Sequence, residues 1–408
     1  MTSRVFALIV GIDSYKSGNI WNLLSCVDDA KRIKHWLRHK LVVPEDHICM
    51  LLDEAATKYT IEESIKKHLV NNPEIQPGDA IVVYFAGHGS TAEAPVGWFS
   101  ADHDTKTEGD SGTPRVNLLC TYDYDTASPA GRVAGISDRS INALLGDVAA
   151  AKGDNILLIL DCSFAADDSS TRNRRFTRFT TSQRVQPHDL SSGLWHSARE
   201  KDFDPTSGFC HPSSTTHTLF CASQHNRNTR ESKDGGRFTT AFIEAVGQLP
   251  LHRVSYDVVL EKTASLMPLD QRPFCAGRKK HEYFLDTVAF LSCHQFVQLD
   301  YLDGNLYRLG LGSLSSLDRG SKLTVHMHNL HGSANPPVGT VVVQDVHPLW
   351  CLARRDDKTA EIPRGCYAKI EGNKIHRRFC RSLLPMLGKL RYNAGRWGST
   401  CFCCSTKT

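Results

Sequence analysis

The chain has 408 residues, of which 40% are hydrophobic and 23% are charged. This composition is typical of soluble globular proteins, and the length is sufficient for two domains. The formal net charge of +4 is too small to indicate nucleic acid or an acidic membrane as a partner. No stretch approaches the roughly 20 consecutive apolar residues that a transmembrane helix needs, and the apolar run near the amino end is too short for a signal peptide.

The 14 cysteines are dispersed along the chain and form no regular disulfide framework. In a chain of this size, such cysteines are typical of reduced, buried side chains in an intracellular protein. We therefore expect a cytoplasmic or nuclear location.

Strands and helices alternate in residues 1–286, which predicts an α/β domain with a mainly parallel central sheet. Apolar runs predict strands at residues 5–12, 47–52, 81–85, 155–160, 217–223 and 282–285. Helical periodicity predicts helices at residues 23–41, 60–70, 137–151, 237–247 and 256–266, the second of them opening on a capping box at Thr60. The polar stretches 90–132 and 165–212 are predicted to be mostly loop.

The pattern changes after residue 286. Short alternating runs separated by glycine-containing turns predict a small, mainly β domain at residues 287–390. The last residues, 391–408, show no periodicity, and we expect an irregular tail there.

Two of the predicted strands are apolar throughout and are followed by side chains that can act as a base or a nucleophile. One is followed by His88 and Gly89, and the other by Asp161, Cys162 and Ser163. A strand that is apolar on both faces is typical of the centre of a parallel sheet, where the working site lies at the carboxyl ends of the strands. The sequence therefore predicts an imidazole beside a small nucleophilic residue, an arrangement that peptidases use. A purely structural histidine is the alternative.

Strand geometry decides which small residue faces the imidazole. Side chains alternate along a strand, so Asp161 and Ser163 are expected to share one face and Cys162 to occupy the other. A one-residue bulge would instead bring Cys162 to the site, where it is otherwise a packing thiol. Gly89 can offer its backbone N–H to a developing oxyanion.

Eight segments occur in the order in which metacaspases carry them, and together they make the chain resemble fungal caspase-domain (peptidase C14) proteins over about residues 4–286. These segments are residues 6–13, 24–30, 84–90, 136–139, 158–163, 219–224, 236–241 and 271–277. The resemblance implies a caspase-hemoglobinase-like α/β/α sandwich for the first domain.

The resemblance also implies roles for individual residues. His88 matches the catalytic histidine, Ser163 stands at the position of the catalytic cysteine, and the N–H groups of Gly89 and Ser163 match the oxyanion hole. Peptide or protein substrates with Arg or Lys before the cleaved bond are implied by an acidic pocket. The substrate-binding positions that match are Asp29, Asp161 and Cys26, whereas Ala86, also expected at the substrate site, replaces the serine that the family often has two residues before the histidine. Without the resemblance, Asp29 would be interpreted as a solvated helix residue.

Departures from the family pattern put the chemistry in doubt. The family has cysteine where Ser163 stands, and usually His-Ser-Gly where Phe164, Ala165 and Ala166 follow. A thiol ionises near neutral pH, whereas a hydroxyl needs a strong, oriented general base. We therefore expect a cysteine-type endopeptidase site of impaired turnover. The alternative is a catalytically inactive module that binds basic peptides or partner caspase domains and regulates them.

The resemblance implies calcium activation, although the chemistry itself needs no cofactor. The carboxylates near the matching places are Asp102, Asp104, Asp138, Asp167 and Asp168, and oxygen ligands of this kind suit calcium. Solvated loop carboxylates are the alternative interpretation. The arginine-rich stretch 172–184 fits a cleavage linker between two subunits, and it fits a solvated basic loop equally well.

Overall fold

The computed structural model describes residues 2–98, 115–164, 176–200, 208–210, 214–224, 229–356 and 361–370. The chain divides into two units. The first comprises residues up to Leu291 together with Leu330–Ala334, and the second comprises Ser292–Asn329 and the residues from Asn335 onward. The predicted boundary at residue 286 therefore falls just inside the first unit. The predicted tail at 391–408 lies outside the described residues.

A six-stranded sheet forms the centre of the first unit. Its order is β13 (Phe274–Ala276), β10 (Thr218–Cys221), β9 (Ile156–Asp161), β3 (Ala80–Ala86), β1 (Val5–Gly11) and β2 (Ile48–Leu52). All neighbours are parallel except β13, which runs antiparallel to β10. Every residue of β1, β3 and β9 is buried, as expected for strands covered on both faces.

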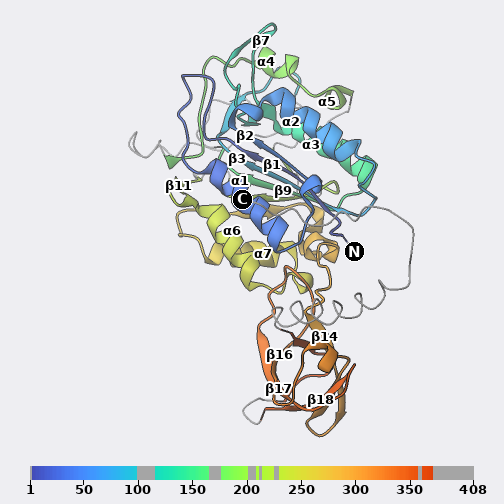
Figure 1. Ribbon diagram of the computed structural model, residues 1–408. Helices are drawn as coiled ribbons and strands as arrows, with labels where there is room; N and C mark the ends of the chain where they lie inside the picture. The colour runs from blue at the N-terminus through green and yellow to red at the C-terminus, as the bar shows by residue number, and fades with distance from the viewer. Residues whose placement is uncertain are drawn as a thin grey trace, which may run out of the picture. The chain divides into compact units, whose positions relative to one another are not determined.

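Helices cover both faces of this sheet (Figure 1). One layer contains α1 (Cys26–His39), α6 (Arg237–Gln248) and α7 (Tyr256–Ser265), and the other contains α2 (Lys58–Ser64) and α3 (Asp138–Lys152). The predicted three-layer sandwich with a mainly parallel sheet is thus confirmed. The amphipathic runs found in the sequence form these helices, because each must bury one apolar stripe against the sheet.

Local predictions fail where tertiary contacts decide the structure. The predicted capping box at Thr60 is wrong, because the cap of α2 is Thr57, whose hydroxyl accepts the Thr60 N–H at 3.2 Å. This helix continues as a π-helical turn at Ile65–Val70. The strand predicted at 282–285 is wrong as well, because short 3₁₀ turns fill Arg278–His281 and Phe284–Thr287, and β13 is the edge strand instead.

The two polar stretches are not only loops. Within 90–132, β4 (Gly89–Glu93) and β5 (Arg115–Leu119) pair as an antiparallel hairpin that β8 (Ile136–Ser137) extends, and β6 (Ala127–Ser128) pairs with β7 (Gly131–Arg132). Within 165–212 the structure has two short helices, α4 (Pro187–Ser192) and α5 (His196–Glu200). A second small hairpin joins β11 (Glu231–Ser232) to β12 (Gly235–Gly236).

The second unit is a closed antiparallel β-barrel, which confirms the predicted small β-rich domain. The strands follow the order β14 (Phe296–Asp303), β15 (Leu306–Leu309), β18 (Cys351–Arg355), β17 (Pro337–Val346), β16 (Lys322–His326) and β19 (Tyr367–Lys369). Alternate side chains fill the barrel, among them Leu309, Val325, Val341 and Ala353. The alternating runs at 305–309, 322–326, 338–343 and 366–370 predict β15, β16, β17 and β19, whereas β14 and β18 were not predicted.

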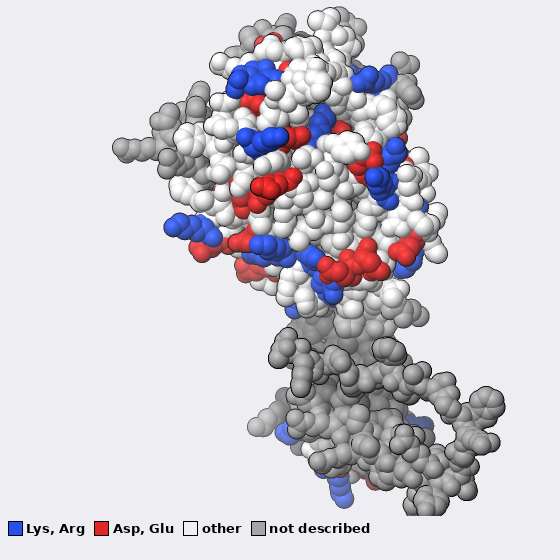
Figure 2. Space-filling model, turned by 45° about the horizontal axis from the view of Figure 1, so that its top comes forward, with Lys and Arg blue, Asp and Glu red and all other residues white. Residues whose placement is uncertain are grey.

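No helix among the described residues combines the length and the apolar character needed to cross a bilayer. On the face shown in Figure 2, Lys and Arg side chains are interspersed with Asp and Glu over the described residues. This mixture agrees with the small net charge of +4.

Helix α1 lies directly on the end of β1, and Gly11 makes this approach feasible. A Cβ at Gly11 would lie 2.7 Å from the Ala30 Cβ and 2.7 Å from the Cys26 carbonyl oxygen. Gly11→Ala is therefore expected to lower the free energy of unfolding by about 1–3 kcal/mol, measured by urea unfolding. Gly18→Ala is the matched control, because nothing lies within 4 Å of its Cβ. Equal stability of the two variants would contradict this packing.

Candidate active site

The predicted catalytic residues lie at the ends of two neighbouring strands. The last pair of the β3–β9 ladder is Ala86 with Asp161, and His88 and Ser163 each follow two residues later. The two backbones touch beyond this pair, since a Cβ at Gly89 would lie 2.1 Å from the Ser163 carbonyl oxygen. Glycine is therefore required at position 89, and both strand tips meet at one edge of the sheet.

His88 is buried and held in one orientation. Its Nε2 lies 2.7 Å from the Trp21 carbonyl oxygen, which can only accept, so the proton resides on Nε2. Its Nδ1 has no hydrogen-bond partner among the described residues and carries the free lone pair. Burial lowers the pKa of His88 to about 4, so the ring is neutral at pH 7. Nδ1 is consequently the atom able to accept a proton.

The Trp21 carbonyl is a functional group that the sequence analysis missed. It fixes the imidazole from the side opposite Nδ1, which is the task of the third group in a catalytic triad. The Tyr15 hydroxyl adds a second constraint, because it accepts the His88 backbone N–H at 2.7 Å. A backbone carbonyl carries no residue-type signal, so no motif could have revealed this one.

Cys162 and Ser163 differ in their surroundings at the end of β9. The β3–β9 ladder runs without a register shift through Asp161, so no bulge turns the strand before Cys162. Burial raises the pKa of the Cys162 thiol well above its ordinary value, which keeps the thiol protonated. The Ser163 hydroxyl is fully buried and has no hydrogen-bond partner among the described residues. It also makes no hydrogen bond to His88 in this state.

A stretch of the chain's own arginine-rich loop occupies the space above these strand tips. The carbonyl oxygen of Arg178 accepts the N–H groups of Gly89 at 3.0 Å and of Ser163 at 3.1 Å. The Arg178 N–H donates to the Thr229 carbonyl at 2.9 Å, and Thr180 donates to the Gly89 carbonyl at 3.0 Å. The segment therefore crosses the site through two single β-bridges, Thr177 with Arg230 and Phe179 with Gly89.

The Arg178 side chain is fully buried among three carboxylates. Its guanidinium nitrogens lie 2.6 Å from Asp29 Oδ2, 2.8 Å from Asp161 Oδ2 and 3.3 Å from Glu231 Oε2. Burial alone would lower the pKa of Arg178, but the charges of Asp161 and Asp29 hold it well above its usual value. The predicted acidic pocket thus exists around a guanidinium, with Glu231 as a third carboxylate.

Backbone and hydroxyl donors fix each of these carboxylates. Asp29, in the first turn of α1, accepts the Gly236 N–H at 2.8 Å, and Asp161 accepts the Thr239 hydroxyl at 2.6 Å. Glu231 accepts the Leu24 N–H at 2.7 Å. Burial raises the pKa of Asp29 to about 6, because desolvation and the nearby Asp161 outweigh Arg178. The pocket is therefore organised by its surroundings as well as by the cation.

Residues 4–285 match the caspase domain family, peptidase C14. The chain belongs to the caspase-domain family. Metacaspase-4 of Arabidopsis thaliana is 27% identical over 208 residues, which cover 48% of this chain and 47% of that protein. The match thus spans about half the length of this relative. A crystal structure of a Geobacter sulfurreducens protein is 19% identical and covers 67% of this chain and 93% of its own, with a TM-score of 0.44.

Two further predicted residues of this caspase domain lie at the edge of the pocket. The Cys26 thiol is 3.8 Å from Glu231 Oε2, and burial raises its pKa well above the ordinary value. Ala86 is buried and sits opposite Asp161 in the ladder. Neither residue makes a hydrogen bond to Arg178 in the described structure, so they shape the pocket rather than bind the guanidinium.

Glu231 is the pocket residue that sequence analysis missed. It lies in a polar hairpin, β11–β12, with no strand-end signal and no recognisable spacing to the other acids. Its position becomes evident only when the hairpin packs against the start of α1, where Ser25 donates to Glu231 Oε2 at 2.9 Å. Asp13, Cys26 and Glu231 also come close enough to share a cation, but backbone N–H groups already engage both carboxylates.

Of the predicted calcium ligands, only Asp138 lies among the described residues. Asp138 is buried at the start of α3, where it accepts the N–H groups of Asn117 at 3.1 Å, Gly208 at 3.1 Å and Arg139 at 2.8 Å. Burial raises its pKa to about 6. These bonds give Asp138 a structural role. Asp102, Asp104, Asp167 and Asp168 lie outside the described residues.

Removing the guanidinium should release the bound segment. Arg178→Ala leaves the buried carboxylates of Asp29, Asp161 and Glu231 without their cation, a loss that typically costs several kcal/mol in a buried pair. We expect the amides of Gly89 and Ser163 to exchange hydrogen about 100-fold faster, measured by hydrogen–deuterium exchange. Arg184→Ala is the control, because Arg184 is exposed on the same loop. Unchanged protection in Arg178→Ala would contradict the role of this ion cluster.

Proposed function

We propose that this caspase domain is a cysteine-type endopeptidase site with a serine in the nucleophile position, which selects Arg or Lys before the cleaved bond and turns over slowly. One observation carries the proposal. The chain holds its own Arg178 with the side chain in an acidic pocket and the carbonyl oxygen on two backbone N–H groups. This is the pose in which a peptide would present a bond for attack.

The geometry supports a definite division of labour. The N–H groups of Gly89 and Ser163 would stabilise the negative charge that develops on the carbonyl oxygen. The hydroxyl oxygen of Ser163 would attack the carbonyl carbon and pass its proton to Nδ1 of His88. The imidazolium would then protonate the leaving amide nitrogen, so that the peptide C–N bond breaks and an acyl ester remains. Water, activated by the same nitrogen, would hydrolyse this ester.

Selection for a cation follows from the pocket. A guanidinium can donate to several carboxylates at fixed geometry, and the pocket presents Asp29, Asp161 and Glu231. A lysine would place one ammonium among the same oxygens, with fewer donors. An acidic residue would be repelled and left without partners, which costs far more than a missing contact.

The weak step is deprotonation of Ser163. The oriented neutral imidazole supplies a base, but its pKa of about 4 makes it a poor acceptor for an alcohol proton. A thiol is far more acidic and needs less help from the base. The weak base at this site would therefore suffice for a cysteine at position 163, whereas the chain has a serine there.

A second candidate function is favoured by the same serine. A chain that cannot cleave peptides would still bind basic peptides, or the basic loop of a partner caspase domain, through Asp29, Asp161 and Glu231. It would then act as a catalytically silent binding or regulatory module. Turnover, rather than binding, separates the two candidates.

The decisive experiment restores the thiol. Ser163→Cys is expected to cleave Arg-containing peptides much faster than the unaltered chain, and to cut its own chain after Arg178, seen as a fragment beginning at Phe179 by mass spectrometry. Adding His88→Ala should lower that turnover by about 10²–10⁴-fold. Assays with and without calcium test the implied activation. If Ser163→Cys cleaves nothing under either condition, the binding module is the better description.

Cys162 provides the matched control. Cys162→Ser in the unaltered chain should leave any residual turnover unchanged, because its thiol is buried and protonated. Efficient cleavage by the unaltered chain that disappears in Cys162→Ser would show that the nucleophile was assigned to the wrong residue.

A further inference from the structure

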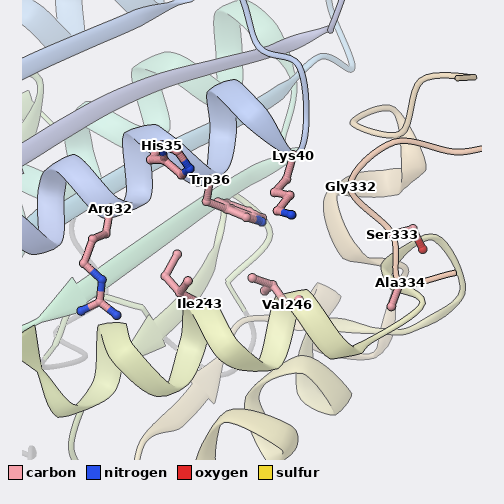
Figure 3. A pocket seen from close by; sticks show the side chains of 10 residues that line it. Arg32, His35, Trp36, Lys40, Ile243, Val246, Gly332, Ser333 and Ala334 are labelled. Atoms are coloured by element: carbon pink, nitrogen blue, oxygen red, sulfur yellow. The ribbon is translucent and has the colours of Figure 1, made fainter. Parts of the chain in front are cut away.

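A cavity of about 470 Å³ lies between α1 and α6, separate from the acidic pocket, and belongs entirely to the first unit. Figure 3 shows that Arg32, His35, Trp36 and Lys40 reach it from α1, and that Ile243 and Val246 face them from α6. Residues 332–334 close one end. This volume lies within the usual range of small-molecule sites.

The closing segment is fixed in place by specific contacts. Ser333 pairs with the ring of His252 at 2.7 Å, and the Ala334 N–H donates to the Leu249 carbonyl at 3.0 Å. Gly332 approaches α1 so closely that a Cβ there would lie 2.4 Å from a methyl of Leu41. The cavity is thus a built feature with walls on three sides.

The charges around this cavity have one sign. Its lining contains Arg32, His35 and Lys40 but no carboxylate. Arg32 is already engaged, because its guanidinium lies 3.3 Å from Asp29 Oδ1 and 3.0 Å from the Thr240 hydroxyl. Lys40 and His35 form no ion pair with any carboxylate of the described residues, so they are free to meet an anion.

Trp36 supplies a second donor to the same end. The residue as a whole is only 3% exposed, but its N–H is not among the buried polar atoms that lack a partner, so this atom is open to the space of the cavity. Figure 3 shows the indole extending across the cavity with its nitrogen toward Lys40. An indole N–H is a hydrogen-bond donor only, so at this position it can donate to a ligand that enters the cavity. Two donors, the Lys40 ammonium and the Trp36 N–H, therefore line the same cavity.

The remaining wall is apolar. Ile243 and Val246 line the α6 side, and the face of Trp36 lies opposite them. Lys40 and Arg32 are eight residues apart on α1, roughly 12 Å at the helical rise, so the apolar stretch between them suits a short chain. Burial of an apolar group against this wall would contribute favourable free energy to the binding of an anion that carries such a group.

We propose that this cavity binds a small amphipathic monocarboxylate. Its carboxylate accepts hydrogen bonds from the Lys40 ammonium and the Trp36 indole N–H, and its apolar body lies against Ile243 and Val246. The carboxyl-terminal stretch of this chain, residues 371–408, is a poor occupant by charge, because it carries eight Lys and Arg residues and only Glu371 as an acidic side chain. This site is independent of the proposed peptidase activity.

Octanoate is the probe, titrated into the full chain by isothermal titration calorimetry up to about 5 mM, a range suited to a ligand of this size. We expect saturable binding of one octanoate, with octylammonium bound at least tenfold more weakly. Lys40→Ala should weaken octanoate binding about tenfold through the lost charged hydrogen bond. Lys67→Ala, which removes the same charge from an exposed site elsewhere, should leave it unchanged.

Gly247→Phe tests the location. Gly247 lines the cavity and nothing lies within 4 Å of its Cβ position, so the new ring can enter the cavity without disturbing the fold. This variant should no longer bind octanoate while keeping its circular dichroism spectrum. The proposal is overturned if octanoate does not bind, or if octylammonium binds with the same affinity as octanoate. It is also overturned if Lys40→Ala and Lys67→Ala have the same affinity for octanoate, or if Gly247→Phe still binds octanoate.

Discussion

The buried guanidinium of Arg178 and its three carboxylates are the interaction on which the site depends. Taking charges out of water is costly, and a buried ion cluster is stable only where close ion pairs and additional hydrogen bonds offset that cost. Here the cluster joins the start of α1, the end of β9 and the β11–β12 hairpin around one side chain. These elements are far apart in the sequence, so the same contacts that bind the cation also assemble the pocket.

The cation also places the backbone. While the Arg178 side chain is held in the pocket, its carbonyl oxygen accepts hydrogen bonds from the N–H groups of Gly89 and Ser163, at the ends of β3 and β9. Under the proposed function this pose would present the peptide bond after Arg178 for attack, and none of these contacts involves the Ser163 side chain. Binding and chemistry are therefore separable in this chain. The acidic pocket and the two N–H donors are both formed, whereas the proposed attacking atom is a hydroxyl oxygen and the proposed base is an imidazole whose pKa is lowered to about 4.

Much of this could be predicted from the sequence. Continuous apolar runs identified β1, β3 and β9, and the rule that sites lie at the carboxyl ends of parallel strands identified His88, Asp161 and Ser163. Asp29 required the family resemblance, because a carboxylate in the first turn of a helix is usually solvated. The rest had no local signal. Glu231 acts through the packing of a hairpin, Trp21 acts through its backbone, and nothing distinguished Arg178 from its arginine neighbours.

The pocket is proposed to recognise a positive charge together with a carbonyl oxygen bound by the two N–H groups. The most direct test is the affinity of the Arg178→Ala chain, whose pocket is vacated, for the free peptide Phe-Thr-Arg-Phe-Thr and for the same peptide with citrulline, the neutral isostere of arginine. We predict that the arginine peptide binds at least about 100-fold more tightly, since buried charged pairs of this kind are worth several kcal/mol. Equal affinities for the two peptides would contradict the claim.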